Sequence, residues 1–191
     1  VCSSHNPDMH MKDYICISDD GHAFSAFCDA NKGDFNGPDK GKPRYGSILL
    51  MNGLPITYKS TTVGVAVADP TIADSHVDTS TGATETYAIG NFTHALMGHK
   101  HKCHDLGLHW PAPLDIYTDN TAAQRFSEGC TPPRSKLQHI AQHQEWVTLV
   151  RDHKLFNIKH VNTKENVADI FTKPVTRNVL EHLRDRIMIK L

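Results

Sequence analysis

The sequence predicts a single α/β domain with a five-stranded mixed sheet, in which three antiparallel strands are followed by two parallel strands and helices flank the sheet. Three observations predict this fold. The first half of the chain contains three strand-like apolar runs, and Asn52-Gly53, a strong hairpin signal, joins the second run to the third. In the second half, helical patterns alternate with two further strand patterns, an order that implies parallel pairing. The 191 residues can bury one core and do not require a second domain.

The antiparallel part of the sheet is expected from three runs of residues. Alternating apolar side chains predict strands over 24–29, 45–51 and 56–59. The preceding residues 1–22 are polar and show no apolar period, so we interpret them as a linker or leader ahead of a domain that covers 23–191.

Residues 60–82 leave two interpretations open. Val63 and Val65 belong to an alternation typical of a strand, whereas Asp69-Pro70 and the residues after it are typical of a loop.

The second half of the chain is expected to alternate helices and strands. Ile89, Phe92 and Leu96 recur at helical spacing and predict a long helix from Ala83 to Gly107. The remaining pattern predicts a strand over 114–118, a short helix over 121–128, a helix over 135–152 and a strand over 155–161.

The last predicted element is a helix over 166–191 that is broken near Pro174. Leu180, Leu183 and Ile187 stand at helical spacing in its second half, so we expect these three side chains to face the core.

Composition limits the classes of protein and of partner. The formal net charge is −1, so the chain is not the strongly basic type that holds nucleic acid by its own charge. There is no apolar run long enough to span a membrane and no signal-peptide pattern at the start, so we expect an intracellular protein without a membrane partner. The cysteines are widely spaced without a CxxC pair, and we interpret them as free thiols: Cys2, Cys16, Cys28, Cys103 and Cys130.

The long helix carries an unusual group of histidines. His94, His99, His101 and His104 stand there, beside Cys103. Their spacing does not match the usual structural zinc patterns, and on a helix they would point to several faces. We therefore interpret them as a solvated, weakly basic surface, with a functional metal site as the alternative.

Four acidic residues are candidates for a catalytic centre. Asp29 ends the first strand, Glu85 falls in the first turn of the long helix, Asp119 ends the fourth strand, and Asp169 lies on the last helix. Groups at strand ends and at neighbouring helix starts converge on one rim of an α/β sheet. Crowded carboxylates repel each other unless cations neutralise them, and oxygen ligands in this number suit Mg²⁺ or Mn²⁺. The pattern indicates two-metal phosphodiester cleavage, although each acid taken alone is more often a solvated charge or a helix cap.

Short motifs surround these acids in a fixed order along the chain. They read FCDAN at 27–31, LMNGLPITYKS at 50–60, ETYAI at 85–89, IYTDNTAA at 116–123 and NVADIFTKP at 166–174. Over about residues 24–180 the chain thereby resembles the ribonuclease H domain of copia-type long-terminal-repeat retrotransposon polyproteins, whose closing motif is NxADIxTKP.

The resemblance implies a role for each acid. It implies a magnesium-dependent endonuclease that hydrolyses the RNA strand of RNA–DNA hybrids with two Mg²⁺ ions, for which Mn²⁺ can substitute. Asp29 would be the ligand shared by both ions, Glu85 and Asp119 would complete the shell of one ion, and Asp169 would hold the ion that activates water. Asn120 and Lys173 would contact the substrate backbone, and the alternative for Lys173 is an ordinary cation near a helix end.

The resemblance also implies a setting. Residues 1–22 would be the link to an upstream reverse transcriptase domain of the same polyprotein, which would contribute the hybrid-binding surface that a near-neutral chain lacks. The implied location is the cytoplasm, inside virus-like particles.

Two other classes of protein are compatible with parts of this pattern. Integrases and transposases of the same fold order their acids as Asp, Asp, Glu, whereas here the Glu comes second and an Asp comes last, which favours ribonuclease H. A transposon-derived domain that has lost activity and only binds or tethers nucleic acid is the second alternative.

Overall fold

The computed structural model of the chain describes residues 14–31, 43–62, 81–120 and 141–187. The elements of the sheet are β1 (Cys16–Ile17), β2 (Ala23–Asn31), β3 (Arg44–Met51), β4 (Leu54–Thr62), β5 (Leu114–Thr118) and β6 (Phe156–His160). The helices are α1 (Thr81–Asp105), α3 (Ala141–Asp152) and α4 (Arg177–Ile187), with two 3₁₀ helices, η4 (Thr163–Glu165) and η5 (Val167–Phe171), between β6 and α4.

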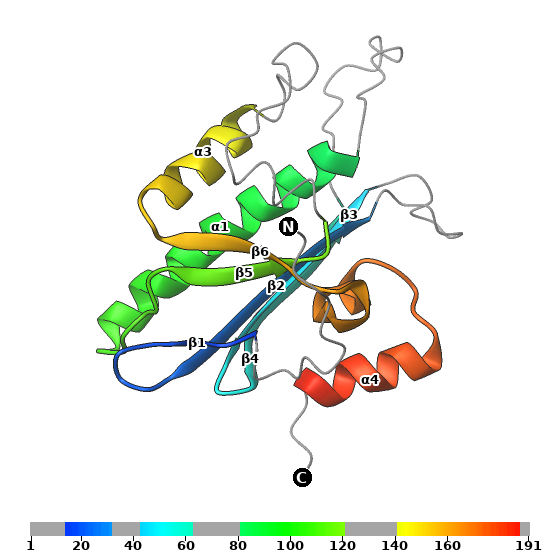
Figure 1. Cartoon of the computed structure of the whole chain (residues 1–191), viewed down its shortest axis with the longest axis horizontal. Coiled ribbons are helices and arrows are strands. Elements are labelled where there is room, and N and C mark those ends of the chain that lie inside the picture. The colour runs from blue at the N-terminus through cyan, green and yellow to red at the C-terminus, as the bar shows by residue number, and fades with distance from the viewer. Residues whose placement is uncertain (1–13, 32–42, 63–80, 121–140, 188–191) are drawn as a thin grey trace, which may run out of the picture.

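The sheet is mixed, as the sequence predicts. Its strand order is β4-β3-β2-β5-β6, and β1 adds a short sixth strand that pairs with the beginning of β2. The pairings of β2 with β3 and of β3 with β4 are antiparallel, whereas those of β2 with β5 and of β5 with β6 are parallel. The predicted five-stranded arrangement of three antiparallel and two parallel strands is confirmed, with β2 at its centre (Figure 1).

The predicted hairpin forms at Asn52-Gly53. Both residues have positive φ, +52° at Asn52 and +79° at Gly53, which a two-residue turn of type I′ requires. The Asn52 side chain also accepts a hydrogen bond from the backbone N–H of Ala23, at 2.9 Å, which ties the turn to the start of β2.

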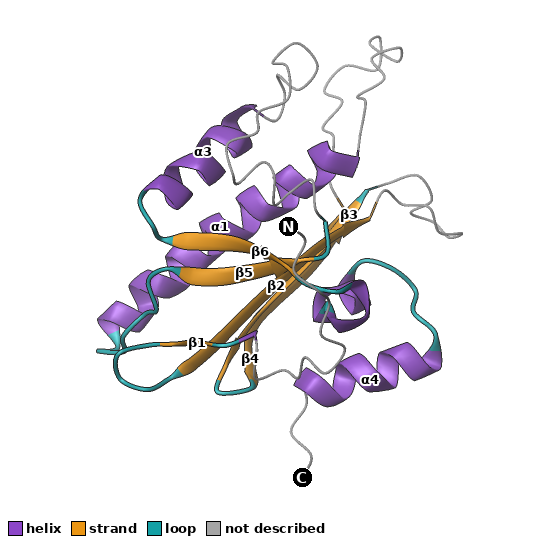
Figure 2. Ribbon diagram, in the orientation of Figure 1, coloured by secondary structure: helices purple, strands orange, loops and turns teal. Residues whose placement is uncertain are grey.

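Helices cover both faces of the sheet and give the domain two hydrophobic cores. Helices α1 and α3 lie on one face, where Phe92 and Leu96 of α1 pack against Leu49 and Ile116 of the strands (Figure 2). Helices η5 and α4 lie on the other face, where Leu183 packs in the second core. The central strand β2 contributes to both cores, because alternate side chains of a strand point to opposite faces.

One expectation is wrong at the N-terminal side of the domain. Residues 1–22 were expected to form no element, but Tyr14 is 2% exposed and Cys16–Ile17 form β1. The Tyr14 ring makes edge contacts with Phe27 and Tyr117, at ring-centre distances of 5.9 and 4.8 Å. Two-residue strands carry too little sequence pattern to be predicted, and partners far along the chain stabilise this one.

The C-terminal helix differs from the expectation in two ways. The break near Pro174 is present, but the part before it is the 3₁₀ helix η5 and only the part after it, α4, is an α-helix. Leu183 is fully buried and Ile187 packs on the second core, whereas Leu180 is 43% exposed, so its predicted inward position is wrong. The three positions lie one turn apart on the same face of the helix, so the exposed Leu180 means that the first turn of α4 does not pack on the core.

Several expectations lie wholly or partly outside the described residues. They are the short helix over 121–128, the first turn of the helix predicted from 135, most of the open stretch 60–82, and the thiols of Cys2 and Cys130. Cys16, Cys28 and Cys103 are free thiols, as predicted. None of the described helices is long and apolar enough to cross a membrane.

Candidate active site

The carboxyl ends of the two central parallel strands carry Asp29 and Asp119. The last paired residues of β2 and β5 are Phe27 and Tyr117, and each acid stands two residues further along its strand direction. Because strand side chains alternate, each acid points to the same face as the aromatic residue before it. Phe27 and Tyr117 belong to the second core, so both carboxylates lie on the face that η5 covers.

Helix η5 brings the third aspartate to this place. Asp169 is 4% exposed, and the Thr172 hydroxyl, one residue after η5, donates a hydrogen bond to the Asp29 carboxylate. Gly46 of β3 lies directly opposite Asp29. A Cβ at Gly46 would come within 2.6 Å of the Phe171 Cβ, so only a glycine lets η5 approach the sheet this closely.

The three aspartates form a compact cluster of oxygen ligands. One carboxylate oxygen from each of Asp29, Asp119 and Asp169 lies within 4.8 Å of the others, and within the described ranges this is the one group of three or more such ligands. The Oδ1 atom of Asp169 is buried and has no hydrogen-bond partner. Hard oxygen donors and an unpaired buried carboxylate oxygen fit a divalent cation such as Mg²⁺ or Mn²⁺.

Glu85 stands beside this cluster rather than within it. It lies in the second turn of α1, because the helix begins at Thr81, four residues before it, so the expected first-turn position is wrong. Glu85 is 6% exposed and shares a hydrogen bond with the Asn120 side chain. The charges of Asp29 and Asp119 act on it, so the structure brings all four predicted acids to one end of the sheet.

Burial and mutual repulsion disfavour the ionised forms of these acids. Burial, followed by the charge of Asp169, raises the pKa of Asp29 to about 7, against the hydrogen bond from Thr172. Burial also raises the pKa of Glu85 to about 8, with further contributions from Asp29 and Asp119. The pKa of Asp169 is raised by burial although Lys173 lies beside it. A site of this kind stores unfavourable electrostatic energy that a bound cation relieves.

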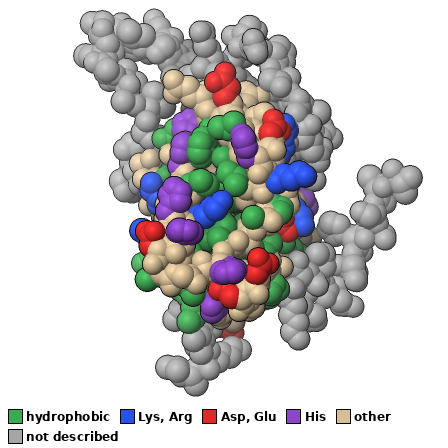
Figure 3. All heavy atoms as spheres, turned by 90° about the vertical axis from the view of Figure 1, so that its left-hand side faces the viewer, with side chains coloured by type: hydrophobic (Ala, Val, Ile, Leu, Met, Phe, Trp, Pro, Cys, Tyr) green, Lys and Arg blue, Asp and Glu red, His purple; other side chains and the backbone are tan. Residues whose placement is uncertain are grey.

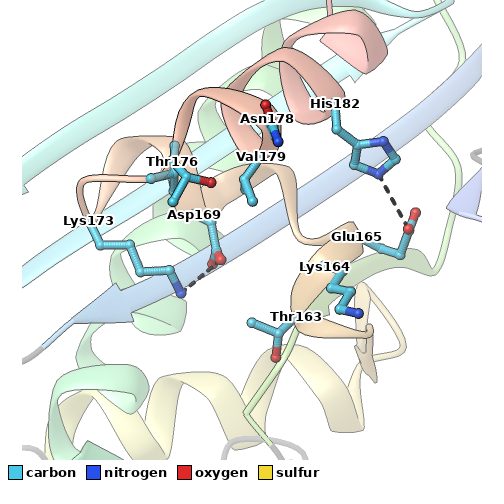
Figure 4. Close-up of a pocket in the computed structure, with 10 residues that line it drawn as sticks. Thr163, Lys164, Glu165, Asp169, Lys173, Thr176, Asn178, Val179 and His182 are labelled. Atoms are coloured by element: carbon cyan, nitrogen blue, oxygen red, sulfur yellow. Dashed lines mark ion pairs between the residues drawn. The ribbon is translucent and has the colours of Figure 1, made fainter.

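Lys173 is a cation in direct contact with the cluster. Its Nζ lies 2.8 Å from the Asp169 carboxylate, and the Lys173 side chain is 31% exposed. Both residues line a hollow of about 580 Å³ between the 3₁₀ helices and α4 (Figure 4). Lys164 also lines this hollow, and on its far side Glu165 forms an ion pair with His182, at 3.5 Å. The hollow therefore lies beside the carboxylate cluster, and two lysines line it.

The raised pKa values predict how stability depends on pH without metal. An acid whose pKa is higher in the folded state binds more protons there than in the unfolded state, so the free energy of unfolding falls as pH rises between the two values. For Asp29 and Glu85 this pH window runs from about 4 to about 8, and the expected loss summed over both groups is on the order of 5–10 kcal/mol. Urea unfolding in EDTA from pH 5 to 8.5 measures it.

Glu85→Gln provides the control for this pH dependence. It removes one of the two titrating groups, so the decline should become shallower above pH 7. Saturating Mg²⁺ should flatten the wild-type curve, because the cation stabilises the ionised carboxylates. A free energy of unfolding that stays constant or rises over this range would contradict the prediction.

The histidines on α1 had left a metal site open as an alternative. No set of three potential ligands forms from the histidines of the described residues. The His94 ring stacks on Trp146 of α3, at a ring-centre distance of 4.0 Å, while His104 has an almost fully exposed side chain. Figure 3 shows histidines spread over one side of the molecule rather than gathered in one place. His94, His101 and His104 are exposed, as a solvated surface predicts, and His94 also contacts α3 through Trp146.

The sequence did not single out three residues that shape the site. Thr172 binds Asp29, Gly46 admits η5, and the fully buried Asn166 lies between the strand ends and η5. Asn166 and Thr172 belong to the motif at 166–174, but a motif alone does not say which atom an amide or a hydroxyl touches. Gly46 lies outside the motifs around the acids.

The fold is similar to that of solved ribonuclease H structures. LC11-RNase H1, isolated from compost by a metagenomic approach, superposes with a TM-score of 0.53 at 12% identity, over 78% of this chain and 91% of that chain. Its structure in complex with an RNA/DNA hybrid gives a TM-score of 0.52 at 10% identity, over 78% and 93%. The domain therefore has a ribonuclease H-like fold. No family model matches the chain, and no curated protein matches its sequence.

Proposed function

We propose that this domain is a ribonuclease H, a metal-dependent endonuclease that hydrolyses the RNA strand of RNA–DNA hybrids. The observation that carries the proposal is the cluster of Asp29, Asp119 and Asp169, whose oxygens lie within 4.8 Å of one another, with a buried oxygen of Asp169 unpaired. The fold adds support, since LC11-RNase H1 has been solved with an RNA/DNA hybrid.

The carboxylates present are suited to hold two divalent cations. We assign Asp29 to both ions, Glu85 and Asp119 to one of them, and Asp169 to the other. Bound Mg²⁺ would lower the pKa of a coordinated water and would neutralise charge on the leaving oxygen. Among the protein groups, Thr172 fixes the Asp29 carboxylate by its hydrogen bond, and Asn120 restrains Glu85.

Cations beside the cluster are suited to the substrate backbone. Lys173 is partly exposed and is held next to Asp169, so its ammonium can meet a phosphate without a large rearrangement. Lys164 stands across the hollow, which is large enough for part of a nucleotide strand that extends beyond the cleaved phosphate. We assign Lys173 and Asn120 to backbone contacts and the hollow to the flanking nucleotides.

We further propose the origin that the motifs indicate. The NVADIFTKP motif at 166–174 and the four motifs before it support a copia-type retrotransposon polyprotein. In that setting an upstream reverse transcriptase domain is the partner, and cytoplasmic virus-like particles are the location. A formal net charge of −1 supports a need for such a partner, because a near-neutral protein makes few phosphate contacts of its own.

The experiment that tests the function uses three labelled substrates. RNA–DNA hybrid, duplex DNA and duplex RNA are incubated with the protein in Mg²⁺, in Mn²⁺ and in EDTA, at low salt. We expect cleavage of the hybrid alone, only with metal, to give 5′-phosphate and 3′-hydroxyl ends. Cleavage that persists in EDTA would overturn the mechanism. A protein that binds metal and hybrid but cuts neither strand would be the inert tethering domain instead.

A further inference from the structure

Asn166 joins all three segments that carry the clustered aspartates. Its side chain is fully buried, between the end of β2, the end of β5 and the start of η5. The amide nitrogen donates to the backbone carbonyl of Cys28, at 3.3 Å, and to Oδ1 of Asp119, at 3.4 Å. The amide oxygen accepts from the backbone N–H of Ala168, at 3.2 Å, and so caps η5.

The chemistry of these contacts selects an asparagine. Two partners are oxygens that need a donor, and the third is an N–H that needs an acceptor, so the side chain must offer both at a fixed separation. An aspartate would offer only acceptors, and a serine would be too short to span the three segments. The backbone carbonyl of Asn166 also accepts from the N–H of Asp169, at 3.1 Å. One residue thus contacts Asp119 directly and Asp169 through the first turn of η5.

We propose that Asn166 is a positioning residue that sets where the Asp119 carboxylate lies relative to Asp29 and Asp169. Its hydrogen bond to the carbonyl of Cys28, the residue directly before Asp29, holds the Asp119 carboxylate at a set position relative to Asp29. A carboxylate held in place before the cation arrives loses less freedom on binding, so Asn166 raises the affinity of the cluster for divalent cations. This inference rests on the proposed function, because it assigns the cluster to metal binding.

The test compares Asn166→Ser with Asn157→Ser. Serine keeps a short side-chain oxygen that can cap η5 but loses the donor to Asp119 and adds no charge. Asn157 makes the matched contact elsewhere in the sheet, since its amide donates to the buried Asp115 carboxylate at 2.9 Å. Thermal unfolding is followed as Mn²⁺ is added. The concentration that gives half of the rise in melting temperature should increase roughly 10-fold or more for Asn166→Ser. It should stay unchanged for Asn157→Ser.

A second measurement on the wild type covers the case in which Asn166→Ser does not fold. In a Mg²⁺ titration followed by NMR, the side-chain amide signals of Asn166 should shift with the same midpoint as the backbone signal of Asp119, whereas those of Asn157 should not move. A wild type that responds to metal while the Asn166 signals or the Asn166→Ser midpoint stay unchanged overturns this inference alone. A wild type whose melting temperature ignores metal overturns the proposed function, and the inference falls with it.

Discussion

Asp29→Asn should lower the rate of hybrid cleavage by about 10³-fold while leaving the fold intact. Asparagine has the shape of aspartate but lacks its charge, and Asp29 is the acid that we assign to both cations. The new amide oxygen can still accept the hydrogen bond from Thr172, so the contact that joins β2 to η5 survives. Single-turnover cleavage of labelled hybrid in Mg²⁺ measures the rate, and circular dichroism with thermal melting measures the fold.

Asp115→Asn is the matched control for this variant. Asp115 is also a buried aspartate near the centre of the sheet, but it pairs with Lys159 and Asn157 and takes no part in the cluster. Its replacement should lower stability and leave the cleavage rate close to that of the wild type. Wild-type cleavage by Asp29→Asn would show that the assignment of Asp29 is wrong.

Asp169→Asn should stabilise the metal-free protein and reduce the stabilisation that metal provides. The raised pKa of Asp169 means that burial disfavours its charge more than the ion pair with Lys173 favours it. A neutral amide removes that cost, so both the free energy of unfolding and the melting temperature should rise. Melting in EDTA at pH 7.5 measures this gain.

The response to metal should change in the opposite direction. In the wild type, Mn²⁺ at about 100 times its dissociation constant should add about 2.7 kcal/mol to the free energy of unfolding. Asp169→Asn should gain clearly less, because it lacks one ligand. Asp152→Asn, at an exposed position on α3, should match the wild type in both conditions. If the wild type ignored Mn²⁺ and Asp169→Asn were no more stable in EDTA, the acids would not share a metal site.

Local sequence rules were sufficient wherever one segment decides its own conformation. The strand at 114–118 has the predicted bounds, and the turn at Asn52-Gly53 has the positive φ angles that its residues predict. Gly107, with φ of +71°, ends the long helix as expected. Its N–H donates a hydrogen bond to the carbonyl of His104, and the N–H of Leu108 donates one to the carbonyl of Cys103. These two hydrogen bonds form a Schellman motif. In each case the backbone preference and the local pattern agree, so no distant partner is needed.

Conformations that depend on distant partners were beyond the reach of the sequence alone. Helix η5 is a 3₁₀ helix held between the Asn166 cap and the bond from Thr172 to Asp29, which lies 143 residues earlier in the chain. Strand β1 exists because Ser25 donates to the carbonyl of Tyr14 and because the Tyr14 ring is buried against two aromatic side chains. Neither set of contacts produces a hydrophobic periodicity in the sequence of η5 or of β1.

The division between sequence and tertiary structure is clearest at the site. The sequence by itself determined which acids are candidates and at which end of the sheet they meet, because strand direction and alternation fix where Asp29 and Asp119 point. Only the tertiary structure decided that Asp29, Asp119 and Asp169 form the close group while Glu85 stands beside it, one turn further into α1 than expected. The reason is physical: separations of a few ångströms depend on how closely η5 packs on the sheet, and the missing side chain of Gly46 sets that approach.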